Sequence, residues 1–312
     1  MTTFQNVNAA FGELLRRIEL NPTWVQLASQ RYNGVKNQIE RALPGKYVKQ
    51  VGSFQRKTKI RPLDPDDPLD IDAIVCFGSF HHYAPPGQGI TPAMALDIVR
   101  RALVGNGAYK IMSPLADAPT VVLEYADGFK IELAPCFVDK TGQYEHPGGP
   151  DCYIVGTTSD SWYPADYDYD ASVITRLNQS FSVQGAFVPS VKLVKAFIRG
   201  QNLGLKSFHS EILCALVIPR AIAYWEAKDL YWGYQYVLAH FLSEVVDFMT
   251  GPVSLPGSYS LPVDSGFSKS ELLERGHYLA RLGELAWKIC ELGDTPEALN
   301  LWREFYGEPF PA

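Results

Sequence analysis

The 312-residue chain has little cysteine, no long apolar run and no excess of basic residues. Its five cysteines form no Cys-x-x-Cys pair, which argues against a zinc ribbon and against a disulfide framework. No apolar stretch approaches the roughly 20 residues of a membrane span. The first five residues also lack the basic segment and apolar run of a signal peptide. We therefore expect a cytoplasmic protein with no membrane partner.

The charge balance bears on the class of substrate. The chain carries 28 Lys and Arg against 34 Asp and Glu, a formal net charge of −6. A protein that follows long nucleic acid usually has a basic face, because cationic side chains neutralise the phosphate backbone. The acidic balance therefore favours small nucleotides over a nucleic-acid partner.

The pattern of apolar residues predicts two different halves. Residues 4–19 and 21–43 have helical spacing, strands are predicted at 47–51 and 71–77, and a helix at 92–104 precedes a hairpin of 120–125 and 129–133. Segments 78–89 and 139–170 are rich in Gly and in Pro or Asp and are expected to be loops. Further helices are predicted at about 171–181, 189–201, 207–224, 230–248, 268–292 and 295–305. We predict a mixed domain at 1–170 and a helical domain at 171–312.

The most informative motif joins a small-residue turn to two alternating acids. Gly52 and Ser53 follow one predicted strand, and Asp70 and Asp72 begin the next. Successive side chains on a strand point to opposite faces, so the two acids share a face. Two such carboxylates can hold a pair of Mg²⁺ ions roughly 3.5–4 Å apart, and small residues let backbone N–H groups approach phosphates. Each half alone also fits a polar strand edge or an ordinary turn, but together they indicate metal-dependent nucleotidyl transfer.

A third acid lies in the predicted hairpin. Glu132 alternates with the apolar residues Ile131 and Leu133. Taken alone it fits a solvated sheet face, but beside the first two acids we interpret it as a third ligand. The predicted catalytic and metal-binding residues are therefore Asp70, Asp72 and Glu132.

Candidate nucleotide contacts follow the same motifs. Lys192, Lys195 and Arg199 recur at i, i+3 and i+7, which predicts either a solvated basic face or a surface that neutralises a polyphosphate. Ser207 is the predicted N-cap of the next helix, where anions are favoured, and Phe208 offers either a stacking face for a base or a core side chain. The predicted contacts are Gly52, Ser53, Arg56, Lys192, Lys195, Ser207 and Phe208.

Together these residues resemble the DNA polymerase β-like nucleotidyltransferase superfamily. Within it they are similar to the branch that holds oligoadenylate synthase, cyclic GMP-AMP synthase (cGAS) and the bacterial CD-NTases (cGAS/DncV-like). The matching segments occur in the family's order over residues 45–215. They are Gly52-Ser53-Phe54-x-Arg56-x-Thr58-x-Ile60-Arg61-Pro62, Asp70-Ile71-Asp72, Ile131-Glu132-Leu133-x-Pro135, residues 191–195 and Ser207-Phe208.

The resemblance implies an α+β fold. It predicts a polymerase-β-like nucleotidyltransferase lobe with a mixed twisted sheet and long N-terminal helices, packed on an all-helical C-terminal lobe. It also implies that Asp70 and Asp72 bind two Mg²⁺ ions (Mn²⁺ is an alternative) and the triphosphate, and that Glu132 binds the catalytic metal and helps to activate a ribose hydroxyl. Gly52, Ser53 and Lys195 would contact phosphates.

The implied activity is template-independent synthesis of a cyclic di- or trinucleotide from ATP and/or GTP, with release of pyrophosphate. The chain has no His–Cys cluster like the zinc thumb of the animal DNA sensor. Together with the negative net charge, this argues against activation by nucleic acid and favours a bacterial CD-NTase of antiphage (CBASS) signalling whose product acts on a downstream effector. We expect the enzyme to be a monomer. The third acid is more commonly Asp in this branch. Two alternatives stay open, namely nucleotidyl transfer to RNA or protein, and a catalytically degraded, nucleotide-binding regulatory relative.

Overall fold

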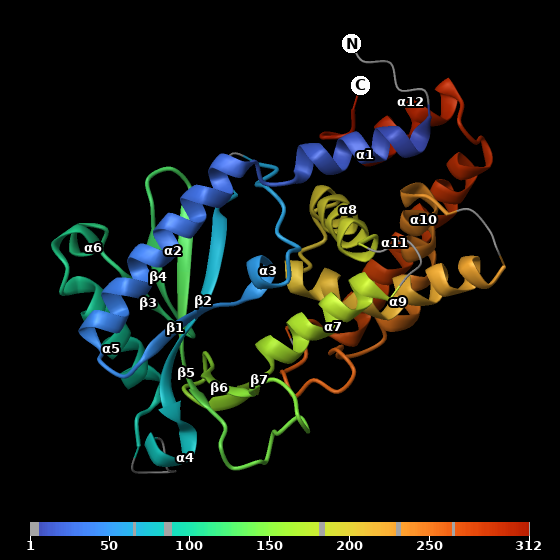
Figure 1. Ribbon diagram of the computed structural model, residues 1–312. Helices are drawn as coiled ribbons and strands as arrows, with labels where there is room; N and C mark the ends of the chain where they lie inside the picture. Colours follow the sequence, from blue (N-terminus) through green and yellow to red (C-terminus); the bar gives the residue numbers. More distant parts are fainter. Residues whose placement is uncertain are drawn as a thin grey trace.

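The computed structural model describes residues 6–64, 67–83, 89–180, 185–228, 232–263 and 266–311. A mixed sheet with its covering helices forms one half of the molecule, and a group of helices forms the other (Figure 1). The short helix α3 (Gly52–Gln55) lies between the halves. This arrangement confirms the predicted α+β fold.

The sheet is built around one parallel pair of strands, β2 (Leu69–Ser79) and β5 (Phe129–Val138). Its strand order is β1-β2-β5-β4-β3, and β6 and β7 extend it from β5. All the other pairings are antiparallel. The outer strands are β1 (Tyr47–Gln50), β3 (Leu115–Asp117), β4 (Thr120–Glu124), β6 (Tyr153–Gly156) and β7 (Trp162–Ala165).

The two faces of the sheet have different environments. On β2, Ile71, Ala73 and Val75 are buried in a core with two helices, α2 (Pro22–Ala42) and α5 (Pro92–Val104). The alternate residues face the other way, so the acids of β2 point away from that core. Farther along this second face, Ile74 and Cys76 pack in a smaller apolar cluster.

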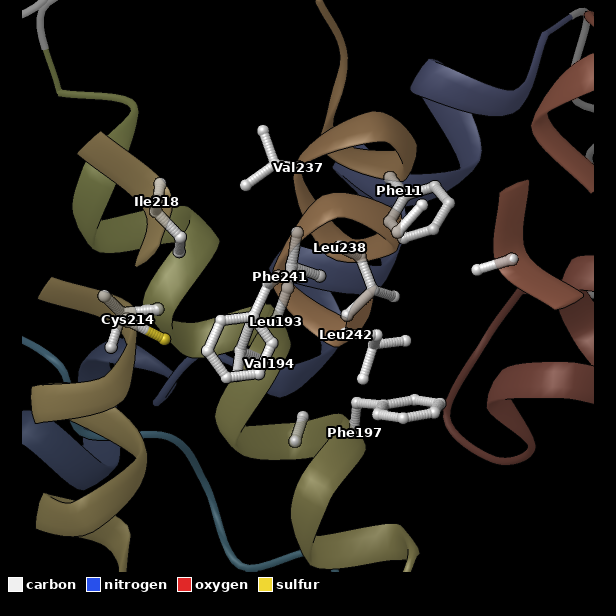
Figure 2. Close-up of a cluster of buried hydrophobic side chains, with 14 of the residues drawn as sticks. Phe11, Leu193, Val194, Phe197, Cys214, Ile218, Val237, Leu238, Phe241 and Leu242 are labelled. Carbon is white, nitrogen blue, oxygen red and sulfur yellow. The ribbon is translucent and has the colours of Figure 1, made fainter. Parts of the chain in front are cut away.

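The helical half has one large apolar core (Figure 2) and a smaller apolar cluster around Ile212, Val253 and Leu255. Aromatic and aliphatic side chains such as Phe197, Phe241 and Leu242 fill the large core and are almost fully buried. Two of its helices have complete N-terminal caps, through Ser268 with a capping box and through Thr295. Its elements are α7 (Tyr167–Gln179), α8 (Phe187–Gly200), α9 (Ser207–Ala227), α10 (Tyr234–Glu244), the 3₁₀ helix η1 (Val245–Phe248), α11 (Lys269–Glu291) and α12 (Pro296–Tyr306).

The two N-terminal helices belong to different cores. The helix α1 (Val7–Ile18) lies beside α12, and its Phe11 packs edge-on against Trp302 at 5.1 Å between ring centroids. The next helix, α2, covers the sheet instead. The prediction of two long helices is confirmed. The division at residue 170 stays a prediction, and any such boundary must accommodate α1 in the helical core.

Some segments predicted as loops contain regular structure. Segment 139–170 holds β6 and β7, and α7 already begins at Tyr167. These strands have only four residues each, β6 ends at Gly156 and β7 contains Pro164, so they lack a clear alternating pattern. Within 78–89, β2 continues to Ser79 and is followed by the single-turn helix α4 (Phe80–Tyr83), while 84–88 lie outside the described residues.

Two helix and strand boundaries also differ from the prediction. The strand predicted at 129–133 is longer in the structure, where β5 continues past Pro135 to Val138. Pro135 is tolerated because it stands between Leu133, the last residue paired with β4, and Cys136, the first paired with β6. The predicted helix 230–248 begins at Tyr234 and changes to 3₁₀ geometry at Val245.

The remaining short helix is α6 (Gly107–Ile111), which follows α5. Among the described residues, no helix is long and apolar enough to cross a bilayer.

The packing of α1 gives a stability prediction. Phe11 is fully buried among three aromatic rings, so Phe11→Ala should lower the free energy of unfolding by about 3–5 kcal/mol. Val25→Ala on α2, where the side chain is 44% exposed, is the control and should change it by less than about 0.5 kcal/mol. Urea denaturation measures both, and equal effects would contradict the placement of α1 in the core.

Candidate active site

Three acids project from one face of the central strands. Asp72 on β2 is the register partner of Glu132 on β5, and Asp70 lies two residues before Asp72 on the same face. The structure thus brings the three predicted acids to one region. Within the described ranges, however, no three acidic, His or Cys side chains are arranged to hold one metal ion. The carboxylate of Glu132 instead meets Lys130, with 2.6 Å between Oε1 and Nζ.

The charges of the two β2 acids are only partly compensated. Burial raises the pKa of Asp70 and of Asp72, and the negative charge of Glu132 raises each further. Lys59 opposes this rise at both acids, although burial lowers its own pKa. The Oδ1 atom of Asp70 is buried without a hydrogen-bond partner. Carboxylate oxygens in this state suit a hard divalent cation such as Mg²⁺, so the donor set fits the expected metal.

The small-residue turn lies directly against Asp72. The N–H of Val51 donates to the carbonyl of Asp72 at 2.9 Å. Gly52 then has a positive φ of 69°, and a Cβ built on it would lie 2.0 Å from Oδ2 of Asp72. The carbonyl of Ser53 accepts from the N–H groups of Thr58 and Lys59, which closes the turn. Only glycine permits this close approach, so Gly52 is required by the position of the second acid.

Behind the turn lies a buried ionic cluster that joins the two halves. The Nε of Arg56 is 2.7 Å from one carboxylate oxygen of Glu211, and the Nζ of Lys195 donates to the other at 2.8 Å. Lys195 also donates to the carbonyl of Thr58 at 2.9 Å. Burial alone raises the pKa of Glu211, but the two cations together lower it to about 2. The guanidinium of Arg56 lies 4.2 Å from the ring centroid of Phe208.

Two of the predicted phosphate contacts line a common hollow. Lys195 near the end of α8 and Ser207 at the start of α9 both border it. Ser207 is the first residue of α9 and not its cap, because Lys206 holds that position without a side-chain hydrogen bond. The N-cap prediction for Ser207 is therefore wrong. The hollow is completed mainly by Ile198, Arg199, Asn202, Leu203, Gly204, Leu205 and Ser210.

The basic stripe of α8 is matched by acids along its length. Lys192 pairs with Glu19 at 2.6 Å, and Arg199 pairs with Asp67. With the buried contact of Lys195, each cation of the stripe has a carboxylate partner. Lys192 therefore lies against the end of α1, whereas Lys195 contacts the turn.

Several residues near the site were not predicted from the sequence. Lys59 faces the acids from a segment without regular periodicity, and Lys130 precedes the third acid by two positions. Glu211 is a fully buried acid inside an apolar helix, which is the one signal that could have revealed it. Asp168 accepts from Gln55 and from Tyr153, so it ties α7 to α3 and to β6.

The N-terminal half of the chain matches a known family. The family model of the Second Messenger Oligonucleotide or Dinucleotide Synthetase domain (SMODS) matches residues 6–161, half of the chain. A probable cyclic nucleotide synthase of Bacillus cereus strain VD146 is 22% identical over 316 residues, which cover 93% of this chain and 89% of that protein.

Solved structures share the fold over nearly the whole chain. CdnC of E. coli MS115-1, determined with ATP, superposes with a TM-score of 0.71 at 14% identity, covering 98% of this chain and 99% of that one. The cyclic AMP-GMP synthase DncV of Vibrio cholerae, determined with the linear intermediate 5′ pppA(3′,5′)pG, gives a TM-score of 0.67 at 14% identity, with 98% and 97% covered. At these identities the likeness concerns the fold.

The approach of Gly52 to Asp72 gives one prediction. Gly52→Ala should destabilise the protein more than Gly45→Ala, the control, which has a similar φ of 79° but no neighbouring atom within 4 Å of the added Cβ. Both variants bear the left-handed backbone cost of about 1–2 kcal/mol. Only Gly52→Ala also forces the carboxylate or α3 to move. Equal losses in urea denaturation would show that the contact is easily relieved.

The buried cluster gives a second prediction. Glu211→Gln leaves two buried cations without a carboxylate and should lower the free energy of unfolding by about 3–5 kcal/mol. Glu13→Gln is the matched control, because Glu13 also pairs with two cations, Arg16 and Arg17, but on the surface of α1. Its loss should be much smaller.

The same variant has a pH signature. The pKa of Glu211 falls from its ordinary 4.5 to about 2 on folding, so its contribution to stability is complete above pH 4.5 and is lost as the pH falls toward 2. The difference in unfolding free energy between wild type and Glu211→Gln should therefore shrink over that range. A difference that stays constant with pH would argue against the ionic origin.

Proposed function

Since this chain belongs to the Second Messenger Oligonucleotide or Dinucleotide Synthetase family, and is thus a nucleotidyltransferase of the CD-NTase type, we propose that it joins ATP and/or GTP into a cyclic di- or trinucleotide. The observation that carries the proposal is the position of Asp70, Asp72 and Glu132 on one sheet face beside the glycine turn. The bound ATP of CdnC and the linear intermediate of DncV support the choice of purine nucleotides.

The acids have the central role in this proposal. Asp70, Asp72 and Glu132 would hold two Mg²⁺ ions, or Mn²⁺, and Asp70 already has a buried oxygen without a partner. When bound, such ions neutralise charge on the phosphates and favour ionisation of an attacking hydroxyl. Lys130 contacts Oε1 of Glu132, so this oxygen must exchange that contact before it can act as a ligand.

The helical half would hold the triphosphate and a base. Lys195 and Ser207 border the hollow at the ends of α8 and α9, and we assign them to the triphosphate together with Gly52 and Ser53. Phe208 would stack on a base, with Arg56 held against its ring by Glu211. Lys192 could reach a nucleotide only after leaving Glu19, so its contribution is expected to be the smallest of the set.

The reaction then consists of repeated phosphoryl transfers at one site. A ribose hydroxyl oxygen of one nucleotide attacks the α-phosphorus of another, the bond to the β-phosphate breaks, and pyrophosphate leaves. Glu132 is proposed to help remove the hydroxyl proton. The linear product would bind again and close on itself in a final transfer, and we place this activity in bacterial antiphage (CBASS) signalling, where a separate effector would read the cyclic product.

A product assay tests the proposal. Purified protein is incubated with each labelled NTP and Mg²⁺ or Mn²⁺, treated with phosphatase and examined for a resistant product. We expect a resistant cyclic species that falls by about a hundred-fold or more in Asp70→Asn and Asp72→Asn. Asp151→Asn, at an exposed acid in the loop after β5, is the control and should retain activity.

Other outcomes would redirect the assignment. Product that forms only after RNA or protein is added would indicate transfer to a macromolecule. Nucleotide binding without turnover under all these conditions would indicate a regulatory relative that has lost its activity.

A further inference from the structure

The third acid has a cation of its own on the same strand face. Lys130 and Glu132 are two residues apart on β5, and their Nζ and Oε1 atoms are 2.6 Å apart. Their side chains are 25% and 27% exposed, so the pair lies at the edge of the acid cluster. Because this contact joins neighbours on one strand, it needs no movement of either half to form.

Lys130 also lies between two further acids in the sheet. Its register partner on β2 is Asp70, and its register partner on β4 is Glu124. Side chains directly opposite each other on neighbouring strands are close enough to interact. The ammonium group therefore lies among three carboxylates, Asp70, Glu124 and Glu132, although it forms an ion pair only with Glu132 in the described structure.

This arrangement explains why the three acids are not gathered around one point. Asp72 and Glu132 are adjacent in register, yet the described residues contain no set of three ligands arranged around one point. The carboxylate that would complete the set is the one that Lys130 holds. A cation that occupies a ligand oxygen and adds positive charge nearby must weaken the binding of a divalent ion there.

We propose that Lys130 is a positioning residue that competes with the divalent metal for Glu132. The inference rests on the assignment of Asp70, Asp72 and Glu132 as metal ligands in the proposed function. In the absence of nucleotide, Lys130 satisfies Glu132 and keeps the metal affinity of the site low. A nucleotide triphosphate contributes further oxygen ligands, so metal loading is coupled to the arrival of substrate.

Direct metal titration without nucleotide tests this proposal. Free Mn²⁺ is followed by electron paramagnetic resonance while it is titrated into the full chain. Lys130→Gln should bind Mn²⁺ more tightly than wild type, on the order of five-fold, the effect of removing one partly exposed ion pair. Lys130→Arg keeps the cation and should bind like wild type. Lys140→Gln is the matched control, because Lys140 pairs with Asp151 at 3.5 Å in an exposed loop and its loss should have no effect.

A double variant distinguishes competition at Glu132 from a general change of charge. If Lys130 acts through Glu132, the gain of Lys130→Gln should disappear in the Glu132→Gln background. The same order of affinities should appear as the rise in melting temperature that Mn²⁺ produces, which also reports whether each variant is folded. Unchanged or weaker Mn²⁺ binding by folded Lys130→Gln, or a gain that persists without Glu132, would overturn the proposal.

The titration is independent of turnover. If the five-fold gain is found but no cyclic product forms, the proposed function fails and the competition at Glu132 stands. If product forms and Lys130→Gln binds Mn²⁺ like wild type, the function stands and this inference fails.

Discussion

The parallel pairing of β2 with β5 is the constraint on which the rest of the structure depends. Its register places Asp72 beside Glu132, although 60 positions separate them in the sequence. The same pairing buries Ile71 and Ile131 on the opposite face under α2 and α5. A slip of one residue would move the acids into that core and the isoleucines out of it, at a large cost in free energy. The hydrophobic face therefore fixes the geometry of the acidic face.

The buried ionic cluster connects this sheet to the helical half. Arg56 and Thr58 belong to the segment after β1, whereas Lys195 and Glu211 belong to α8 and α9. A buried carboxylate shared by two cations is stable only while all three partners are in place. The cluster therefore makes the position of the glycine turn depend on the position of α8 relative to α9. A ligand that contacts Lys195 would act on the turn through the same cluster.

The sequence was most informative where a pattern is local. Alternation at Asp70 and Asp72 and helical spacing at 92–104 were enough to predict the face of the acids and the helix α5 with its bounds. The cationic residues were harder to interpret, because an ion pair depends on partners remote in sequence. Arg56 and Lys195 find a common partner in Glu211, and Lys192 finds Glu19. Short strands such as β6 were missed because four residues contain too few alternations to distinguish them from a loop.

In the chain alone, the negative charges of the acidic face are only partly compensated. Burial and repulsion by neighbouring acids raise the pKa values of Asp70 and Asp72. Lys59 opposes this rise at both acids, Lys130 at Asp70 and Arg56 at Asp72. Lys59 and Lys130 both belong to the sheet half of the chain, so this half supplies positive charge to its own acids. Such compensation stabilises the fold before any ion binds, but two single charges cannot match a divalent ion in field strength. In the proposed function, the site folds with its lysine contacts in place and exchanges one of them for a metal when a nucleotide brings further oxygen ligands.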